Sequence, residues 1–197
     1  MTKEKAKNRP TRILSVDYLI ADMVVELEGN AELAKLIDKY KMLPGSKSRI
    51  DQEGFEAFSR AIEGHAVNIF PGGSAANALY AVGKILDGIG AKGSNAHSKM
   101  IEDSLKEAGI KLIPHRFPAE DKGIRPETTV SFVVKFPGGG RAIATYAGNA
   151  DKLITPDVIT DELVKDSDLV FVQGSLYRKF DYAMPDRLLD LARKYKK

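Results

Sequence analysis

Apolar β-strand patterns alternate with amphipathic helical patterns along most of this chain, and this alternation limits the fold more than any other feature. The predicted strands are short runs of branched and aromatic residues at 12–17, 66–70, 110–114 and 168–172. The predicted helices carry apolar residues three and four positions apart and lie at 31–40, 51–62, 97–108 and 182–197, with a further helix start at Thr155. Strands separated by helices favour an α/β fold with a mostly parallel sheet. The nearly continuous apolar run at 168–172 is typical of a parallel strand that is covered on both faces.

Three segments differ from this pattern and predict a second, smaller sheet. Residues 128–136 and 141–146 are two strand patterns joined by Pro137-Gly-Gly-Gly140, and together they form the clearest hairpin in the chain. Residues 23–28 alternate apolar and polar side chains, as a strand with one solvent-exposed face does. We therefore expect a small β-sheet beside the main parallel one.

The composition is that of a folded protein without cysteine chemistry. Apolar residues make up 43% of the 197 residues, which is enough for a sizeable core. Cysteine is absent and the three histidines have no metal-ligand spacing, so we expect neither disulfides nor a metal site in this chain. No apolar run is long enough to cross a bilayer, and the first ten residues lack the apolar centre of a signal peptide. We therefore expect a cytoplasmic protein without a membrane partner.

The net charge of +3 arises from the two ends of the chain. Residues 1–12 carry five basic side chains, and residues 193–197 carry four. Without these nine basic residues and Glu4, the body retains 21 basic and 26 acidic residues, a net charge of −5. A nucleic-acid groove needs a positive folded surface, so we expect no nucleic-acid partner. Residues 1–11 are predicted to be a disordered basic tail.

One glycine pattern is excluded as a nucleotide site by its context. Gly88-Ile-Gly-Ala-Lys-Gly93 matches the dinucleotide pattern G-x-G-x-x-G. That pattern must leave a strand and enter a helix, whereas here it follows a helix predicted to end near Leu86. No P-loop pattern occurs in the chain.

A second glycine pair, Gly72-Gly73, stands between an extended segment and a helix that begins at Ser74. The first N–H groups of a helix point outward with partial positive charge, and a ligand oxygen can approach them closely where no β-carbon intervenes. Asn77, one turn further on, would present an amide to the same ligand. The alternative is that the glycines only permit a tight turn, with Ser74 as an ordinary helix cap.

Several short motifs in the correct order resemble the ribokinase-like (PfkB) family of sugar and nucleoside kinases. Gly72-Gly-Ser-Ala-Ala-Asn77 is similar to the N-terminal signature of that family, and the segment from Ile13 to Asp22 is similar to its first strand, which ends in an aspartate. Lys39-Tyr-Lys-Met-Leu-Pro-Gly45 is most similar to the adenosine-kinase-like branch. Further similar segments are Thr128-Thr129, residues 137–141, Tyr146-Ala-Gly148 and Val172-Gln-Gly174.

The resemblance implies a three-layer α/β/α ribokinase-like domain over residues 12–197, with a small β-sheet lid near 23–28 and 128–146. It implies that Asp22, Gly72, Gly73 and Asn77 bind the hydroxyls of a sugar or nucleoside, with adenosine as one option. It also implies transfer of the γ-phosphoryl group of ATP, with Mg²⁺, to a substrate hydroxyl. Arg141 either stabilises the transferred phosphate or is an ordinary exposed arginine of the hairpin.

The chain departs from the family where catalysis is expected. The family's catalytic base is the aspartate of a Gly-Ala-Gly-Asp segment, and no Gly-Asp dipeptide occurs in this chain. The last predicted helix, 182–197, would also lead into a further strand that the sequence does not contain. We therefore expect the N-terminal, substrate-binding and lid part of a kinase, with no catalytic residue of its own and inactive in isolation. The alternative is a non-catalytic module that binds a sugar, a nucleoside or another chain. An unpaired sheet edge beyond Leu169 predicts self-association, for example as a homodimer.

Overall fold

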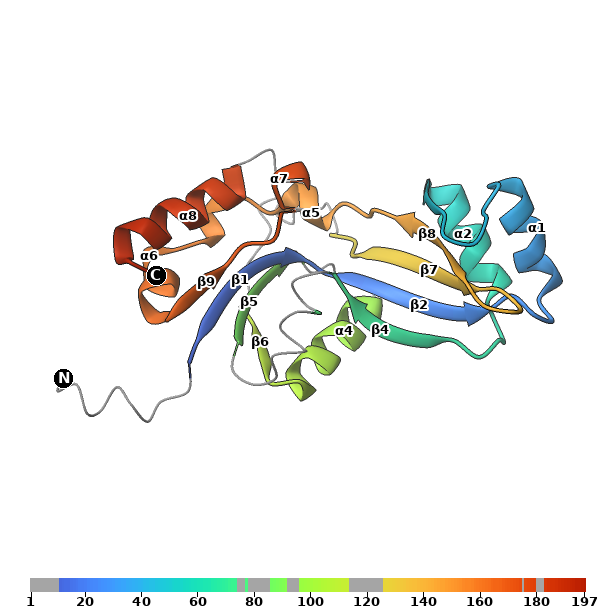
Figure 1. The fold of residues 1–197 in the computed structure, drawn as a ribbon, viewed down its shortest axis with the longest axis horizontal. Helices are drawn as coiled ribbons and strands as arrows, with labels where there is room; N and C mark the ends of the chain where they lie inside the picture. Colours follow the sequence, from blue (N-terminus) through green and yellow to red (C-terminus); the bar gives the residue numbers. More distant parts are fainter. Residues whose placement is uncertain are drawn as a thin grey trace.

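The computed structural model describes residues 11–73, 77, 86–91, 96–113, 126–174, 176–179 and 183–197. These residues form two β-sheets that lie end to end, with helices packed against both (Figure 1). The predicted basic tail, apart from Thr11, lies outside the described residues, as does the start of the helix predicted at Ser74. No helix in the described part of the chain is long and apolar enough to cross a membrane.

The first sheet contains four parallel strands in the order β6-β5-β1-β9. These are β1 (Ile13–Tyr18), β5 (Leu86–Ala91), β6 (Ile110–Leu112) and β9 (Leu169–Phe171). Successive strand residues point to opposite faces, so Ile13 and Leu14 pack into different cores on the two sides of the sheet. This part of the chain is a three-layer α/β/α arrangement, as the sequence predicts.

Helices form the outer layers of this arrangement. Helix α4 (Ala96–Glu107) lies on one side of the first sheet, and α6 (Asp161–Asp166) and α8 (Ala183–Tyr195) lie on the other (Figure 1). Two short helices, α5 (Ala150–Leu153) and α7 (Leu176–Lys179), lie near one end of α8, above the place where the two sheets meet (Figure 1).

The second sheet contains five strands in the order β3-β8-β7-β2-β4, with both parallel and antiparallel pairs. These are β2 (Ile20–Glu26), β3 (Lys47–Ile50), β4 (Asn68–Gly72), β7 (Thr129–Lys135) and β8 (Arg141–Tyr146). Helices α1 (Ala31–Lys39) and α2 (Gln52–Ala61) pack on one face of it (Figure 1). Only the buried Leu19 separates β1 from β2, so one nearly continuous run of chain passes from the first sheet into the second.

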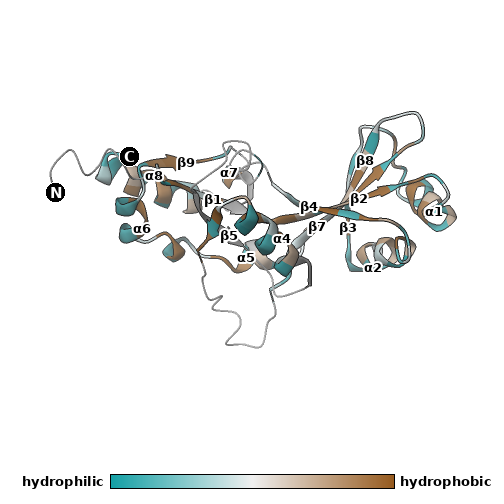
Figure 2. Cartoon of the chain, turned by 90° about the horizontal axis from the view of Figure 1, so that it is seen from below, coloured by the Kyte–Doolittle hydropathy of each residue, from teal (hydrophilic) through white to brown (hydrophobic). Residues whose placement is uncertain are grey.

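Aromatic side chains form the core between the second sheet and its two helices. Phe58 is fully buried, and its ring centroid lies 5.1 Å from that of Phe132 and 5.8 Å from that of Tyr40. Phe55 stacks on Tyr146 with 4.7 Å between the centroids. Figure 2 shows hydrophobic residues along the strands, where this core lies. The helices therefore stabilise one face of the sheet by apolar burial.

Local sequence signals are confirmed at several helix ends. Asn30 accepts a hydrogen bond from the backbone N–H of Leu33 at 2.9 Å and so caps α1. Asp51 caps α2 in the same way through Gly54, also at 2.9 Å. Gly109 follows α4 with a φ of 79°, as the predicted helix stop requires. The predicted hairpin is present as β7 and β8.

The predictions for the chain between 155 and 172 are partly wrong. The run at 168–172 is not covered on both faces, because Leu169 is 48% exposed whereas Val170 packs against the core on the other face. In the described sheet β9 is an edge strand, as the unpaired edge predicted beyond Leu169 requires. The helix predicted from Thr155 is only a 3-10 turn at Pro156–Val158. Helix α6 begins later, where the hydroxyl of Thr160 accepts a hydrogen bond from the next turn.

The second sheet also differs from its prediction. Among the described residues the second sheet is not the smaller of the two, because it contains five strands and the first sheet contains four. The strand predicted at 23–28 begins at Ile20, so Asp22 lies inside β2 and not at the end of the first strand. Strand β3 was not predicted at all. Gly88 and Gly90 lie within β5, which begins at Leu86, so the helix predicted to end near Leu86 does not extend to that residue. The exclusion of a dinucleotide site stays a prediction.

Asp161 joins α6 to α8. Its carboxylate accepts hydrogen bonds from Lys194 Nζ at 2.7 Å and from the hydroxyl of Tyr195, and it lies 3.5 Å from a guanidinium nitrogen of Arg187. The hydrogen bonds from Lys194 and then Tyr195 lower the pKa of Asp161 to about 2. The ionised carboxylate is therefore part of the packing of the last helix.

We expect Asp161→Asn to destabilise the protein near neutral pH and to destabilise it less at acidic pH. A carboxylate with a lowered pKa stabilises the fold fully above its ordinary value of 3.8, and this stabilisation is lost as the pH falls toward about 2. The difference in denaturation midpoint between the wild type and the variant should therefore shrink over that interval. Asp190→Asn removes an exposed partner of Arg193 on α8 and should change the midpoint little at any pH. A pH-independent difference for Asp161→Asn would contradict this account.

Candidate functional site

A cavity of about 370 Å³ opens on the face of the second sheet that α1 and α2 do not cover. The alternation of side chains along β2 creates it, because Met23 and Val25 pack toward the helices while Asp22 and Val24 point into the cavity. Residues of β4, β7 and β8 complete the wall together with Asn77. The volume falls within the range of small-molecule sites.

Asp22 belongs to a row of polar side chains that crosses three strands. Its register partner on β7 is Ser131, and the partner of Ser131 on β8 is Thr145. The hydroxyl of Ser131 donates a hydrogen bond to the Asp22 carboxylate, and its Oγ lies 3.1 Å from Oγ1 of Thr145. Either hydroxyl can be the donor of the hydrogen bond between Ser131 and Thr145. The row fixes the position of the carboxylate from one side.

The environment of Asp22 disfavours its ionised form. Burial raises the pKa of Asp22 above its ordinary value of 3.8. The hydrogen bond from Ser131 and the positive charges of Arg141 and Lys47 oppose this shift without cancelling it. A ligand that donates hydrogen bonds to the carboxylate oxygens would favour the ionised form and offset part of the desolvation.

Gly72 and Gly73 are glycines for two different reasons. A β-carbon at Gly72 would lie 2.5 Å from Oδ2 of Asp22, so any other residue there would displace the carboxylate. Gly73 has a φ of 105°, which glycine adopts without a steric penalty. Its carbonyl accepts a hydrogen bond from the backbone N–H of Asn77 at 3.0 Å, as in the first turn of a helix. The backbone conformation alone therefore accounts for Gly73, whereas the Asp22 carboxylate requires Gly72.

The structure brings three of the five predicted site residues to one cavity. Asp22, Asn77 and Arg141 all line it. Gly72 lies against the carboxylate of Asp22, and Gly73 is not among the lining residues. Their roles in binding stay predictions.

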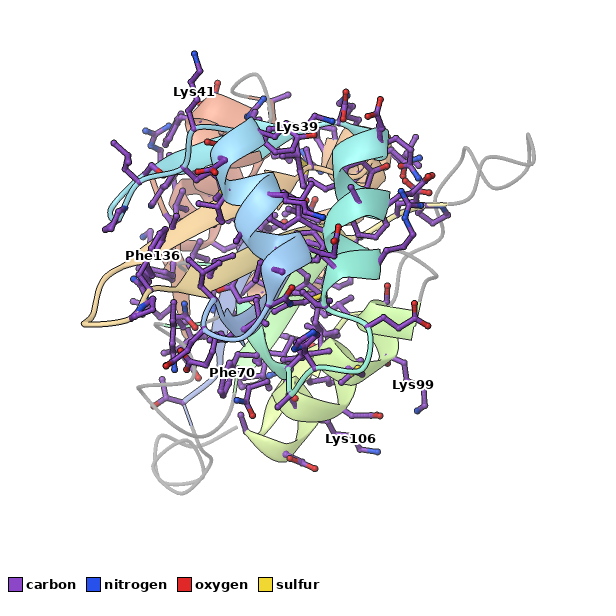
Figure 3. The ribbon with its side chains drawn as sticks, turned by 90° about the vertical axis from the view of Figure 1, so that its right-hand side faces the viewer. Lys39, Lys41, Phe70, Lys99, Lys106 and Phe136 are labelled. Atoms are coloured by element: carbon purple, nitrogen blue, oxygen red, sulfur yellow. The ribbon has the colours of Figure 1, made fainter. Side chains whose placement is uncertain are left out.

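Two further residues of the site were missed in the sequence. Ser131 is buried within β7, and a serine between the apolar Val130 and Phe132 was the available signal. Phe70 is the register partner of Asp22 on β4, lines the cavity and is 53% exposed. In Figure 3, Phe70 lies between α1 and α4 in the view. The sequence alone could not predict that Phe70 lies beside Asp22, because only the pairing of β2 with β4 brings these two residues together.

Among the residues that the structure describes, no three histidine, aspartate or glutamate side chains are arranged to hold a metal ion. The cavity therefore offers one carboxylate from β2, the amides of Asn68 and Asn77 and a cationic side, together with an apolar wall. Such a set of groups can bind hydroxyls and, near Arg141, an anion.

Solved structures of adenosine kinases and of a sugar kinase share the fold of this chain. The adenosine kinase of Sinorhizobium meliloti superposes with a TM-score of 0.73 at 15% identity, over 96% of this chain and 55% of that chain. A probable sugar kinase of Rhizobium etli CFN 42 gives a TM-score of 0.73 at 17% identity, over 94% and 53%. The adenosine kinase of Schistosoma mansoni in complex with tubercidin gives 0.67 at 13% identity, over 93% and 52%.

The chain therefore has the ribokinase-like α/β fold of adenosine kinases, as its motifs predict, and it spans about half the length of the structures it matches. No protein-family model matches the sequence, and no curated protein matches it.

We expect Gly72→Ala to destabilise the protein through its contact with Asp22. The added methyl group would displace the carboxylate, and such overpacking costs about 1–3 kcal/mol. The loss should largely disappear when Asp22 is also alanine, which a double-mutant cycle measured by chemical denaturation would detect. Gly174→Ala is the matched control, because no atom lies within 4 Å of a β-carbon built there. If Gly72→Ala lowers the stability equally with and without the Asp22 carboxylate, the contact between the methyl group and Asp22 is not the cause of the loss.

Asp22→Asn should stabilise the ligand-free protein at neutral pH. A carboxylate with a raised pKa contributes its stability below 3.8 and loses it as the pH rises through the folded-state value. Asparagine has no charge to desolvate, so the gain in melting temperature should grow as the pH rises above about 4. Asp38→Asn, an exposed change on α1, should show no such trend. A variant that melts below the wild type at neutral pH would refute this prediction.

Proposed function

We propose that this chain binds a sugar or nucleoside in the cavity of the second sheet, as the substrate-binding and lid part of an ATP-dependent kinase. The observation that carries the proposal is the setting of Asp22, whose carboxylate lines a cavity together with Asn77 and is held by Ser131 and Gly72. The fold shared with adenosine and sugar kinases supports it.

Asp22 accepts hydrogen bonds from two substrate hydroxyls in this proposal. A carboxylate has two oxygens that accept strong hydrogen bonds, and vicinal hydroxyls match their spacing. Ser131 orients the carboxylate from the β7 side, so the free lone pairs face the cavity. The amide of Asn77 adds a donor and an acceptor to the same ligand. Phe70 and Val24 supply an apolar surface for the carbon face of the sugar or for a base.

The second sheet acts as the lid over this ligand. It carries Asp22, Lys135 and Arg141 on its open face, so that its movement toward the first sheet would enclose the bound hydroxyls. Exclusion of water from a site of phosphoryl transfer prevents hydrolysis of the phosphoryl donor. Arg141 has the charge to stabilise a transferred phosphate.

The groups that bind ATP and Mg²⁺ in such a kinase would have to come from outside the described residues. The described residues contain no cluster of ligands for a metal ion, and the sequence contains no Gly-Asp dipeptide to provide the family's catalytic base. ATP would supply the phosphoryl group when bound, and this chain would orient the hydroxyl that accepts it.

A second candidate function is a non-catalytic module that binds the same ligands, because the carboxylate and amides that line the cavity can bind hydroxyls without a phosphoryl donor. The two candidates differ in one measurable respect. A kinase releases ADP from ATP in the presence of its sugar or nucleoside, whereas a binding module shows ligand binding without ADP release.

We expect Asp22→Asn to weaken the binding of a sugar or nucleoside by about 1.5–3 kcal/mol, the range for hydrogen bonds to a charged group. A thermal-shift screen of sugars and nucleosides identifies the ligand, and calorimetric titration then compares the two proteins. Asp38→Asn serves as the control, because Asp38 is exposed and is not among the residues that line the cavity. The proposal fails if Asp22→Asn binds the ligand as tightly as the wild type does.

A further inference from the structure

The open face of the second sheet carries three successive rows of side chains across β2, β7 and β8. The register fixes these rows, because partner residues on neighbouring strands point to the same face. The first row is Asp22, Ser131 and Thr145, the second is Val24, Val133 and Ile143, and the third is Glu26, Lys135 and Arg141. Hydroxyl-binding, apolar and charged groups thus follow each other along the strands.

The third row contains an arrangement that destabilises a sheet unless something offsets it. Lys135 and Arg141 are direct partners on antiparallel strands, and like charges in this position repel each other. Glu26 offsets one of the two charges, since its Oε1 lies 3.1 Å from Lys135 Nζ. Within the described ranges, no acidic group lies at ion-pair distance from Arg141. Arg141 therefore lines the cavity with its charge available.

The excess positive charge extends toward Asp22. Arg141 and Lys47 are the two cations whose charges act on the Asp22 carboxylate. A binding site for a neutral polyol needs the carboxylate and hydrogen-bonding amides. The proposed function gives Arg141 a role at the transferred phosphate but leaves Lys47 without one. An anionic ligand, in contrast, would be repelled by Asp22 unless cations stood nearby.

We propose that the ligand of this cavity is a polyol with an anionic substituent, a phosphate or a carboxylate. Its hydroxyls bind Asp22 and its anionic group binds Arg141. This inference rests on the proposed function and narrows its substrate class.

The geometry suits such a ligand. The first and third rows are four residues apart along the strands, which corresponds to roughly 13 Å between their backbones. The long side chain of Arg141 shortens this distance inside the cavity, and the valines of the second row cover the carbon skeleton between the two ends. A guanidinium group can bind a phosphate or a carboxylate through two parallel hydrogen bonds, which fixes the orientation of the ligand.

The test is calorimetric titration of the full 197-residue chain without ATP. The ligands are two matched pairs, ribose with ribose 5-phosphate and glucose with glucuronate, and the wild type should bind the anionic member of at least one pair more tightly. Arg141→Gln should lower the affinity for that anionic ligand by roughly 10- to 100-fold and leave the affinity for its neutral counterpart unchanged. Asp22→Asn should weaken both members.

Arg49→Gln is the matched control. Arg49 is exposed on β3, pairs in register with Thr145 and does not line the cavity, so the variant loses the same charge from the same sheet. Its affinity for the anionic ligand should stay at the wild-type value, and melting temperatures measured on the same samples check that each variant is folded.

The outcomes separate this inference from the proposed function. If neutral and anionic ligands bind equally and Asp22→Asn weakens both, the inference is wrong and the proposed function stands. Arg141→Gln and Arg49→Gln could also weaken the binding of the anionic ligand equally. The ligand would then be attracted by the overall charge of the sheet and not by a specific site at Arg141, and the inference is again wrong. The inference is also wrong if Arg141→Gln leaves the affinity for the anionic ligand unchanged in the absence of ATP. Arg141 would then act only on the transferred phosphate. If none of the four ligands binds, the inference is wrong, and the proposed function then stands or falls on the screen of sugars and nucleosides described above.

Discussion

The second sheet has one face that α1 and α2 cover and one face that they leave open, and the candidate site depends on this difference. Phe58 and Phe132 bury their rings on the covered face, where apolar burial stabilises the sheet. The open face is therefore free to hold groups that do not stabilise the fold. Because strand residues alternate between the faces, each polar residue of the site lies next to a core residue in the sequence.

Asp22 illustrates how such a face accepts an unfavourable group. Its carboxylate is half-buried, its pKa is raised by burial, and Gly72 leaves just enough room for it. Ser131 supplies one hydrogen bond, so the carboxylate is oriented without being fully satisfied. Groups held in this way at a cavity are typical of binding sites, where a ligand completes the hydrogen bonding.

The sequence predicts those parts of this arrangement that depend on near neighbours. Asn30 and Asp51 cap their helices through the third following residue, and Pro137 to Gly140 specify a hairpin, so both signals are local. Strand β3 escapes prediction because Lys47 to Ile50 has little apolar character and is a strand only through its pairing with the distant β8. For the same reason the row of Asp22, Ser131 and Thr145 is invisible in the sequence, where more than a hundred residues separate its first two members. The resemblance to kinases supplied Asp22, and only the register supplied its neighbours.

The passage of β1 into β2 through Leu19 has a mechanical consequence. Asp22 stands three residues beyond Leu19 on a strand that is bonded on both sides within the second sheet. The backbone of Asp22 therefore cannot shift relative to Ser131 and Gly72 without breaking strand pairing, so any change in the angle between the two sheets would move these three residues together. The distance of Asp22 from the first sheet would follow that angle, and a ligand that contacts both sheets would fix the two together.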